Sequence, residues 1–347
     1  MQLPRQGKNG LDSSLCHWRG RHDQGRYVSP TTPQTVIMRP IPGRKQTAGT
    51  GATVGTVPEL PDLVHVEAVL RRSVCGLPIA DVRVGDPVVL RIMVPDPFPA
   101  ALKGKRIVEV KRRGQFLRFD LDGGLCLVVN AMLTGRYSLV ETGTRAGRDL
   151  ILALAFSGGT ELRYADETRM GKIYVARVDQ LDQIPGFATL GVDLLSDDFT
   201  LPHMRRLVAN RRDQVRQFLL DKTALASIGN AYADEILFAA RLHPKTFCHK
   251  LQADEVDRLF AAIRNTLNAA IREIQARNQP IEVKVRDFLK VRGRAGAPCP
   301  VCATTIRRVR VGRDDACFCP ICQPTERKLF VDFRKVPRTA KKKPVKA

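Results

Sequence analysis

Four cysteines near the C-terminal end of the 347-residue chain constrain its fold more than any other feature. Cys299, Cys302, Cys319 and Cys322 form the pattern C-x2-C-x16-C-x2-C. Two such pairs can supply four thiolates in a tetrahedron around one zinc ion, and the sixteen residues between them suit a β-hairpin. Because four protein ligands leave no open position on the metal, the predicted zinc is structural, with one ion per chain. The spacing therefore predicts a small zinc finger at residues 291–324.

The charge of the chain points to a polyanionic partner. Lys and Arg number 57 against 35 Asp and Glu, which gives a net charge of +22, and nucleic acid is the first candidate. The predicted finger hairpin carries Arg307, Arg308, Arg310 and Arg313, which we expect to meet phosphate. The sequence has no run of eighteen apolar residues, so a membrane span is excluded and an anionic membrane surface is the weaker alternative.

Hydrophobic patterning divides the chain into five parts. Residues 1–57 are basic and have no sustained apolar period, so they are predicted to be a disordered leader. Residues 58–187 show a first helix and then short apolar runs between turn signals, which is typical of an antiparallel β-sandwich with a flanking helix. Residues 188–290 change to a helical period and predict an all-α domain. The finger at 291–324 and a basic tail at 325–347 complete this multidomain chain of α and β parts.

The individual elements follow from the same periods. The strands expected in the sandwich are residues 79–84, 106–110, 116–121, 125–129, 150–156, 161–164 and 172–178. The helices expected in the α domain are residues 201–208, 215–220, 232–240 and 253–276. Between two of these helices, Gly229 and Asn230 form a turn that can present backbone N–H groups to a phosphate, although most helix connections are only turns.

Pro58 and Glu59 open the foldable part of the chain and allow two interpretations. In the first, Pro58 and Pro61 simply start a helix. In the second, Pro58 is the first residue of the mature protein, and its free secondary amine, which an internal proline lacks, attacks C1′ of a sugar while Glu59 donates or accepts a proton. The second interpretation requires a start at Val57 with removal of the initiator, or cleavage of an organellar transit peptide.

Several motifs occur together in an order that resembles the formamidopyrimidine-DNA glycosylase / endonuclease VIII family. The resemblance extends from Pro58 to about Gln323. The motifs are PELPD at 58–62, RRGQFL at 112–117, LTGR at 133–136, YADETRMG at 164–171, IGNAYADE at 228–235 and the cysteine pattern. The resemblance implies an N-terminal β-sandwich, a helix-two-turn-helix DNA-binding domain and a zinc-finger hairpin.

The family resemblance also implies a function, base excision repair, in which oxidised bases are removed from damaged double-stranded DNA. A DNA clamp of this size is expected to work as a monomer. A damaged base is flipped out of the duplex, an N-terminal proline attacks C1′, and the strand is cleaved by β-elimination. Pro58 takes the role of nucleophile, Glu59 protonates the opening deoxyribose, and Leu133 is the wedge that fills the gap in the base stack. The positions with which the family grips phosphates around the lesion fall on Arg169, Arg212, Arg216 and Asn230.

Two departures from the family pattern put the catalytic role in question. Gln115 stands where the family has a lysine that contacts DNA and assists catalysis, and a neutral amide can neither act as a base nor carry charge. The family also has an arginine in the finger hairpin, five residues before the third cysteine. Asp314 stands at this position here, with Arg313 one residue earlier as a candidate substitute. The alternative hypothesis is therefore a damaged-DNA-binding protein with weakened catalysis. Under either hypothesis, the expected location of the protein is cytoplasmic and nucleoid-associated, or organellar if the leader is a transit peptide.

Overall fold

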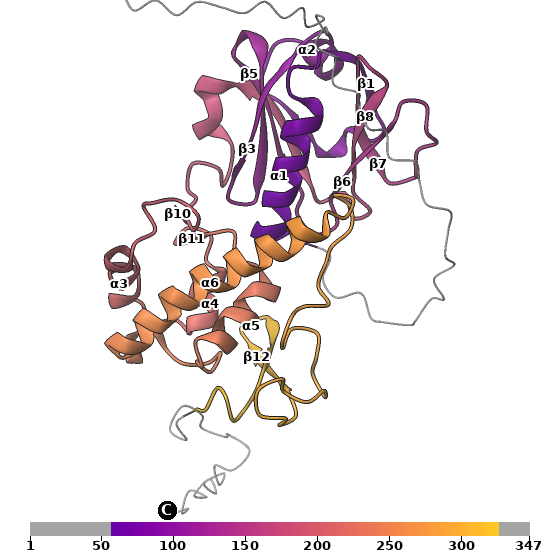
Figure 1. Cartoon of the computed structure of the whole chain (residues 1–347). Coiled ribbons are helices and arrows are strands. Elements are labelled where there is room, and N and C mark those ends of the chain that lie inside the picture. The colour runs from indigo at the N-terminus through magenta and orange to yellow at the C-terminus, as the bar shows by residue number, and fades with distance from the viewer. Residues whose placement is uncertain (1–56, 326–347) are drawn as a thin grey trace, which may run out of the picture. The chain divides into compact units, whose positions relative to one another are not determined.

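The computed structural model describes residues 57–325. The leader predicted for residues 1–57 and the tail predicted for residues 325–347 lie outside the described part, apart from Val57 and Thr325. Figure 1 shows the described elements, which are two β-sheets with a flanking helix, a group of helices, and a hairpin near the C-terminal end.

The first helix, α1 (Leu60–Val74), begins directly after Pro58 and Glu59. Pro61 lies in its first turn, where a missing N–H group costs nothing, and the backbone N–H of Glu59 donates to Asp62 Oδ2 at 2.8 Å. The predicted helical period is confirmed, because the apolar residues at that spacing are buried. The helix start therefore places Glu59 at the boundary of a rigid element.

Two sheets form the β-sandwich. The first has the strand order β1 (Ile79–Val84), β7 (Leu150–Phe156), β8 (Thr160–Ala165) and β6 (Arg136–Glu141), and all of its pairings are antiparallel. The second has the order β2 (Leu90–Ile92), β9 (Lys172–Arg177), β5 (Leu125–Asn130), β4 (Phe116–Leu121) and β3 (Ile107–Arg113). In the second sheet only the short β2 runs parallel to its neighbour. The seven predicted strands are confirmed to within three residues, whereas β2 and β6 are additional.

The remaining elements are short connections and the helices of the second half. The helices there are α3 (Leu201–Ala209), α4 (Val215–Leu220), α5 (Asn230–Ala239) and α6 (Ala253–Arg277). The connections are α2 (Phe98–Leu102), the two-residue strands β10 (Val192–Asp193) and β11 (Leu225–Ala226), and the 3₁₀ turns η1 (Pro87–Val89), η2 (Asp122–Gly124), η3 (Val178–Gln183) and η4 (Cys248–Lys250). The four predicted helices are confirmed to within two residues at each end.

Two large cores hold these elements together. One lies among the sandwich strands and includes Leu63 and Leu70 from α1, whereas the other lies among the four helices of the second half. Leu60 belongs to the second core, and α1 also packs against α6. Burial of a leucine side chain contributes roughly 1.5–3 kcal/mol. The first turn of α1 thus ties the sandwich to the helices at the position of Glu59.

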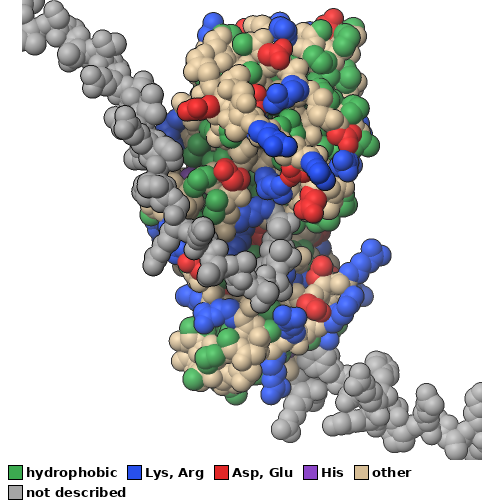
Figure 2. Space-filling view, turned by 90° about the vertical axis from the view of Figure 1, so that its right-hand side faces the viewer, with side chains coloured by type: hydrophobic (Ala, Val, Ile, Leu, Met, Phe, Trp, Pro, Cys, Tyr) green, Lys and Arg blue, Asp and Glu red, His purple; other side chains and the backbone are tan. Residues whose placement is uncertain are grey.

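The C-terminal hairpin consists of β12 (Arg307–Val311) and β13 (Asp314–Phe318), which pair antiparallel as predicted. A small apolar cluster that includes Phe238 of α5 and Ile306 packs the hairpin against the helices. Figure 2 shows Lys and Arg side chains spread over the face that it displays, with acidic and hydrophobic side chains between them. None of the described helices combines the length and the apolar composition that a membrane crossing needs.

Candidate active site

A cavity of about 290 Å³ gathers many of the residues that the sequence singles out. Five of the predicted site residues line it, namely Pro58, Glu59, Gln115, Leu133 and Asn230. These residues come from the start of α1, the β3–β4 turn, the loop after β5 and the N-terminus of α5. Positions separated by more than 170 residues in the sequence therefore meet at one site.

The carboxylate of Glu59 is buried against the N-terminus of α5. Glu59 Oε1 accepts from the N–H of Ala231 at 2.9 Å, and Oε2 accepts from the N–H of Tyr232 at 3.1 Å. Burial raises the pKa of Glu59, although these two hydrogen bonds and the nearby Arg286 act in the opposite direction. Glu59 therefore keeps its proton to higher pH than an ordinary glutamate, as a proton donor requires.

Gly229 makes this approach of Glu59 possible. It precedes α5 as the N-cap residue, and a Cβ atom at this position would lie 2.3 Å from Cδ of Glu59. The sequence leaves open whether this Gly-Asn turn presents N–H groups to a phosphate or is only a turn. In the structure, the N–H groups of Ala231 and Tyr232 donate to Glu59, so these two are not free for a phosphate.

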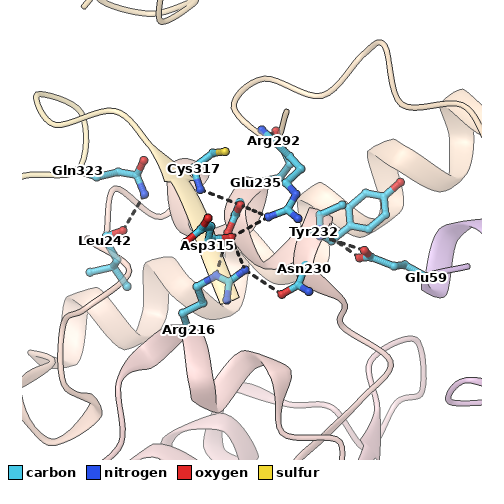
Figure 3. Close-up of polar contacts among 12 residues, drawn as sticks. Glu59, Arg216, Asn230, Tyr232, Glu235, Leu242, Arg292, Asp315, Cys317 and Gln323 are labelled. Atoms are coloured by element: carbon cyan, nitrogen blue, oxygen red, sulfur yellow. Dashed lines mark hydrogen bonds and ion pairs between the residues drawn. The ribbon is translucent and has the colours of Figure 1, made fainter. Parts of the chain in front are cut away.

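On the side of the Gly229–Asn230 turn away from Glu59, a buried ionic network holds Asn230 in place (Figure 3). Arg216 is fully buried, and its guanidinium donates to Asp234 Oδ1 at 2.9 Å and to Asn230 Oδ1 at 2.8 Å. Asp234 Oδ2 in turn accepts from Arg292 Nη1 at 3.0 Å and from the N–H of Cys317 at 2.9 Å. Because Arg216 holds the amide oxygen of Asn230, the NH₂ group of Asn230 is left to donate elsewhere.

Glu235 anchors the segment that precedes the finger. Its carboxylate accepts from the backbone N–H groups of Lys290, Val291 and Arg292 at 2.8–2.9 Å. Burial raises the pKa of Glu235, and these hydrogen bonds oppose that change. Sequence reasoning missed the structural role of Asp234 and Glu235. The available signal was a pair of acids inside a helix that is otherwise apolar in sequence.

Two exposed apolar side chains lie on loops that are joined to each other. Leu133 follows β5 and is 45% exposed, and Met170 follows β8 and is 46% exposed. The hydroxyl groups of Thr134 and Thr168 lie 2.7 Å apart and connect the two loops. Exposed apolar side chains on a fixed loop suit insertion between bases.

The other predicted site residues lie in different surroundings. Gln115 lines the cavity, and its Oε1 atom is buried without a hydrogen-bond partner among residues 57–325. Arg169 is exposed and pairs with Asp86, and Arg212 is exposed on the segment before α4. Arg313 is exposed in the hairpin turn, whereas the next residue, Asp314 at the start of β13, lines the cavity. The roles of these residues remain predictions.

The four cysteines of the finger form a compact cluster that could hold a metal ion. The ligand atoms of Cys299, Cys302, Cys319 and Cys322 all lie within 4.8 Å of one another. Three of the Sγ–Sγ distances are 3.4, 3.5 and 3.8 Å. A tetrahedral ion with bonds of about 2.3 Å requires sulfurs about 3.8 Å apart. The cluster therefore fits four-coordinate metal binding.

Comparison with known proteins gives matches over most of the chain. The model of the formamidopyrimidine-DNA glycosylase N-terminal domain matches residues 57–173, and that of the formamidopyrimidine-DNA glycosylase H2TH domain matches residues 190–279. The formamidopyrimidine-DNA glycosylase of Pelotomaculum thermopropionicum is 33% identical over 275 residues, which are 77% of this chain and 99% of that protein. The enzyme of the same name from Symbiobacterium thermophilum is 35% identical over 276 residues, 77% of this chain and 90% of the relative.

Solved structures also match this chain over most of its length. The complex of the Lactococcus lactis protein Fpg with DNA that contains an abasic site is 25% identical, has a TM-score of 0.70, and is matched over 77% of this chain and 100% of that one. The complex of the same protein with DNA that contains an oxidized pyrimidine has a TM-score of 0.72 with the same identity and coverage.

Proposed function

The chain belongs to the formamidopyrimidine-DNA glycosylase family and is a base excision repair DNA glycosylase that acts on damaged DNA, and from this premise we propose that it also cleaves the strand at the abasic site through Pro58. The observation that carries the proposal is the cavity in which Pro58 and the buried Glu59 lie together. The nucleophile and a proton donor are the minimum that this covalent route needs.

The proposal requires that Pro58 is the first residue of the active form. After Val57, the proline nitrogen is a tertiary amide without a lone pair to donate, whereas a terminal proline has a secondary amine. The match to the family's N-terminal domain begins at residue 57, one position before Pro58, and supports this start.

In this mechanism, each of the side chains around the cavity has a separate role. The protonated carboxyl of Glu59 gives its proton to the ring oxygen as the C1′–O4′ bond breaks, and the Pro58 nitrogen forms a bond to C1′. The damaged base leaves with the proton of the Pro58 amine, and the C1′=N Schiff base remains. Leu133 fills the gap in the base stack, while Arg169 and Arg212 contact phosphates. Arg216 is fully buried and acts indirectly, because it holds the amide oxygen of Asn230 and leaves the NH₂ group of Asn230 to donate to a phosphate.

We propose zinc as the metal of the cysteine cluster, because four thiolates are a preferred ligand set for zinc. Its role is structural. It holds the hairpin in which Cys317 donates to the buried network around Asp234. We also propose that the chain is divided into the five parts described from its sequence. The protein acts as a monomer and is located in the cytoplasm, associated with the nucleoid.

A second candidate function is damage binding with weakened catalysis. The observation that favours it is that a neutral amide, Gln115, and an acid, Asp314, both line the cavity. Neither group can supply a positive charge to a sugar or a phosphate. This candidate expects salt-dependent binding of an abasic duplex without cleavage.

The deciding experiment compares a protein that begins at Pro58 with one that begins at Met1. Both are incubated with an abasic-site duplex and sodium borohydride, which reduces a Schiff base to a stable adduct. We expect a covalent adduct and strand cleavage only for the Pro58 form. Tight binding by the Pro58 form without adduct or cleavage would refute the catalytic proposal and support damage binding.

A further inference from the structure

The cavity contains a lysine that takes no part in the mechanism proposed for Pro58 and Glu59. Lys222 lies in the turn between α4 and β11, and its side chain lines the same cavity as Pro58, Glu59 and Gln115. Among the described residues that line this cavity, the cationic side chains are Lys222 and Arg292. Arg292 is already engaged, because its Nη1 atom donates to Asp234 and to the carbonyl of Asp315 at 3.0 Å each.

The backbone around Lys222 is well fixed. The carbonyl oxygen of Lys222 accepts from the N–H of Gly191 at 2.9 Å. The preceding residue, Asp221, accepts from the N–H of Thr223 at 3.0 Å and from Arg211 at 2.8 Å. The position of the Lys222 backbone at the cavity is therefore set by both neighbouring segments.

The ammonium group of Lys222 is available to a ligand. Within residues 57–325 it has no hydrogen bond and no ion pair, and the side chain remains exposed at the mouth of the cavity. The surrounding protein partly desolvates it and lowers its pKa, while the nearby Glu59 carboxylate acts in the opposite direction. More of Lys222 is thus neutral amine at a given pH than in an ordinary lysine.

Strand cleavage at an abasic site needs a proton acceptor next to the sugar. Asn130, Asn230 and Gln115 line the cavity but are neutral amides that cannot accept a proton. An arginine stays protonated, and a carboxylate such as Asp314 is a much weaker base than an amine. Glu59 already serves the opening of the sugar ring. An amine at the mouth of the cavity is the remaining choice.

We propose that Lys222 is a catalytic residue of abasic-site cleavage, in which its neutral amine accepts the proton from C2′. This role rests on the proposed lyase function. The electron pair of the C2′–H bond forms the new double bond between C2′ and C3′, and the C3′–O bond breaks so that the 3′ phosphate leaves. The proton stays on Nζ of Lys222, and water later hydrolyses the Schiff base and releases the Pro58 amine.

The test uses the protein that begins at Pro58 and two substitutions at one position. Lys222→Arg keeps the positive charge but cannot accept a proton, and Lys222→Gln removes both properties. The matched control is Lys250→Arg, because Lys250 lies in η4 and does not line this cavity. For each protein we would measure the affinity for an abasic duplex, the yield of borohydride-trapped adduct, and the single-turnover rate of strand cleavage.

We expect Lys222→Arg to bind and to form the adduct like the unsubstituted protein, but to cleave the strand roughly 100-fold more slowly or worse, the usual contribution of a proton-transfer residue. Cleavage by Lys222→Arg at the unsubstituted rate overturns the proposal, and weaker binding by Lys222→Gln alone would then assign Lys222 to phosphate contact. Absence of adduct and cleavage in the unsubstituted protein overturns the proposed function itself, and this role with it.

Discussion

Neutralising Asp234 tests whether the buried network holds the finger against the helices. Asp234 is fully buried and is the carboxylate partner of both Arg216, which is also fully buried, and Arg292. In Asp234→Asn, Arg216 loses its counter-charge in a site from which water is excluded, and Arg292, whose side chain is 20% exposed, loses its carboxylate partner. Removal of one partner of a buried ion pair costs about 3–5 kcal/mol. This is a large part of the roughly 5–15 kcal/mol that stabilises a typical domain.

The matched control is Asp257→Asn. Asp257 pairs with Arg205 through a 2.7 Å contact, but both side chains are about half exposed, and such surface pairs contribute about 0–1 kcal/mol. Native-state hydrogen exchange of peptides from α5 and β13 measures the local opening free energy in both variants. A loss of about 3 kcal/mol corresponds to exchange roughly 100-fold faster. Equal exchange rates in the two variants would refute the assignment of the network as a structural anchor.

Three further results are expected. Gly229→Ala should lower the base-excision rate of the Pro58 form by roughly 100-fold with little loss of DNA affinity, because the new Cβ displaces the carboxylate of Glu59; an unchanged rate would show that Glu59 adapts. Burial lowers the pKa of His243 to about 4, so the neutral imidazole contributes fully to the free energy of unfolding above pH 6.5, and this contribution is lost as the pH falls toward 4. The melting temperature of His243→Gln should therefore fall less between pH 6.5 and 4 than that of the unsubstituted protein. Elemental analysis should find one zinc per chain, and its removal or Cys302→Ser should weaken DNA binding while circular dichroism still reports the β-sandwich; full affinity without metal would contradict a structural role.

Local patterns in the sequence predict most of the fold. The 25-residue helix α6 is predicted to within one residue, because its apolar period is long and it ends at Asn278 in a left-handed conformation with φ of 43°. Strand β6 was missed, because its mixture of partly buried residues shows no clear alternation in the sequence. The cysteine cluster was predicted from spacing alone, since four thiolates at that spacing have few other uses.

The candidate active site could be predicted only in part. Pro58, Glu59 and Asn230 were singled out because they stand in recognisable motifs, and the structure brings them to one cavity. The contacts of Asp234 with Arg292 and Cys317, and the position of Lys222 at the cavity, were not found, because they depend on segments that meet only in the folded protein. No local period encodes a hydrogen bond between residues 83 positions apart.

The contact between Glu59 and α5 also has a consequence for the timing of synthesis. The carboxylate and the N–H group of Ala231 are 172 residues apart in the chain. At about 5–20 residues per second, a ribosome needs roughly 10–35 s to make the second partner after the first. A nascent or prematurely ended chain that contains only the sandwich therefore has the proposed nucleophile Pro58 but lacks the N–H groups of α5 that hold the Glu59 carboxylate. If Glu59 is the proton donor, such a fragment should not remove bases from DNA, and base excision should begin only after the ribosome has made both halves.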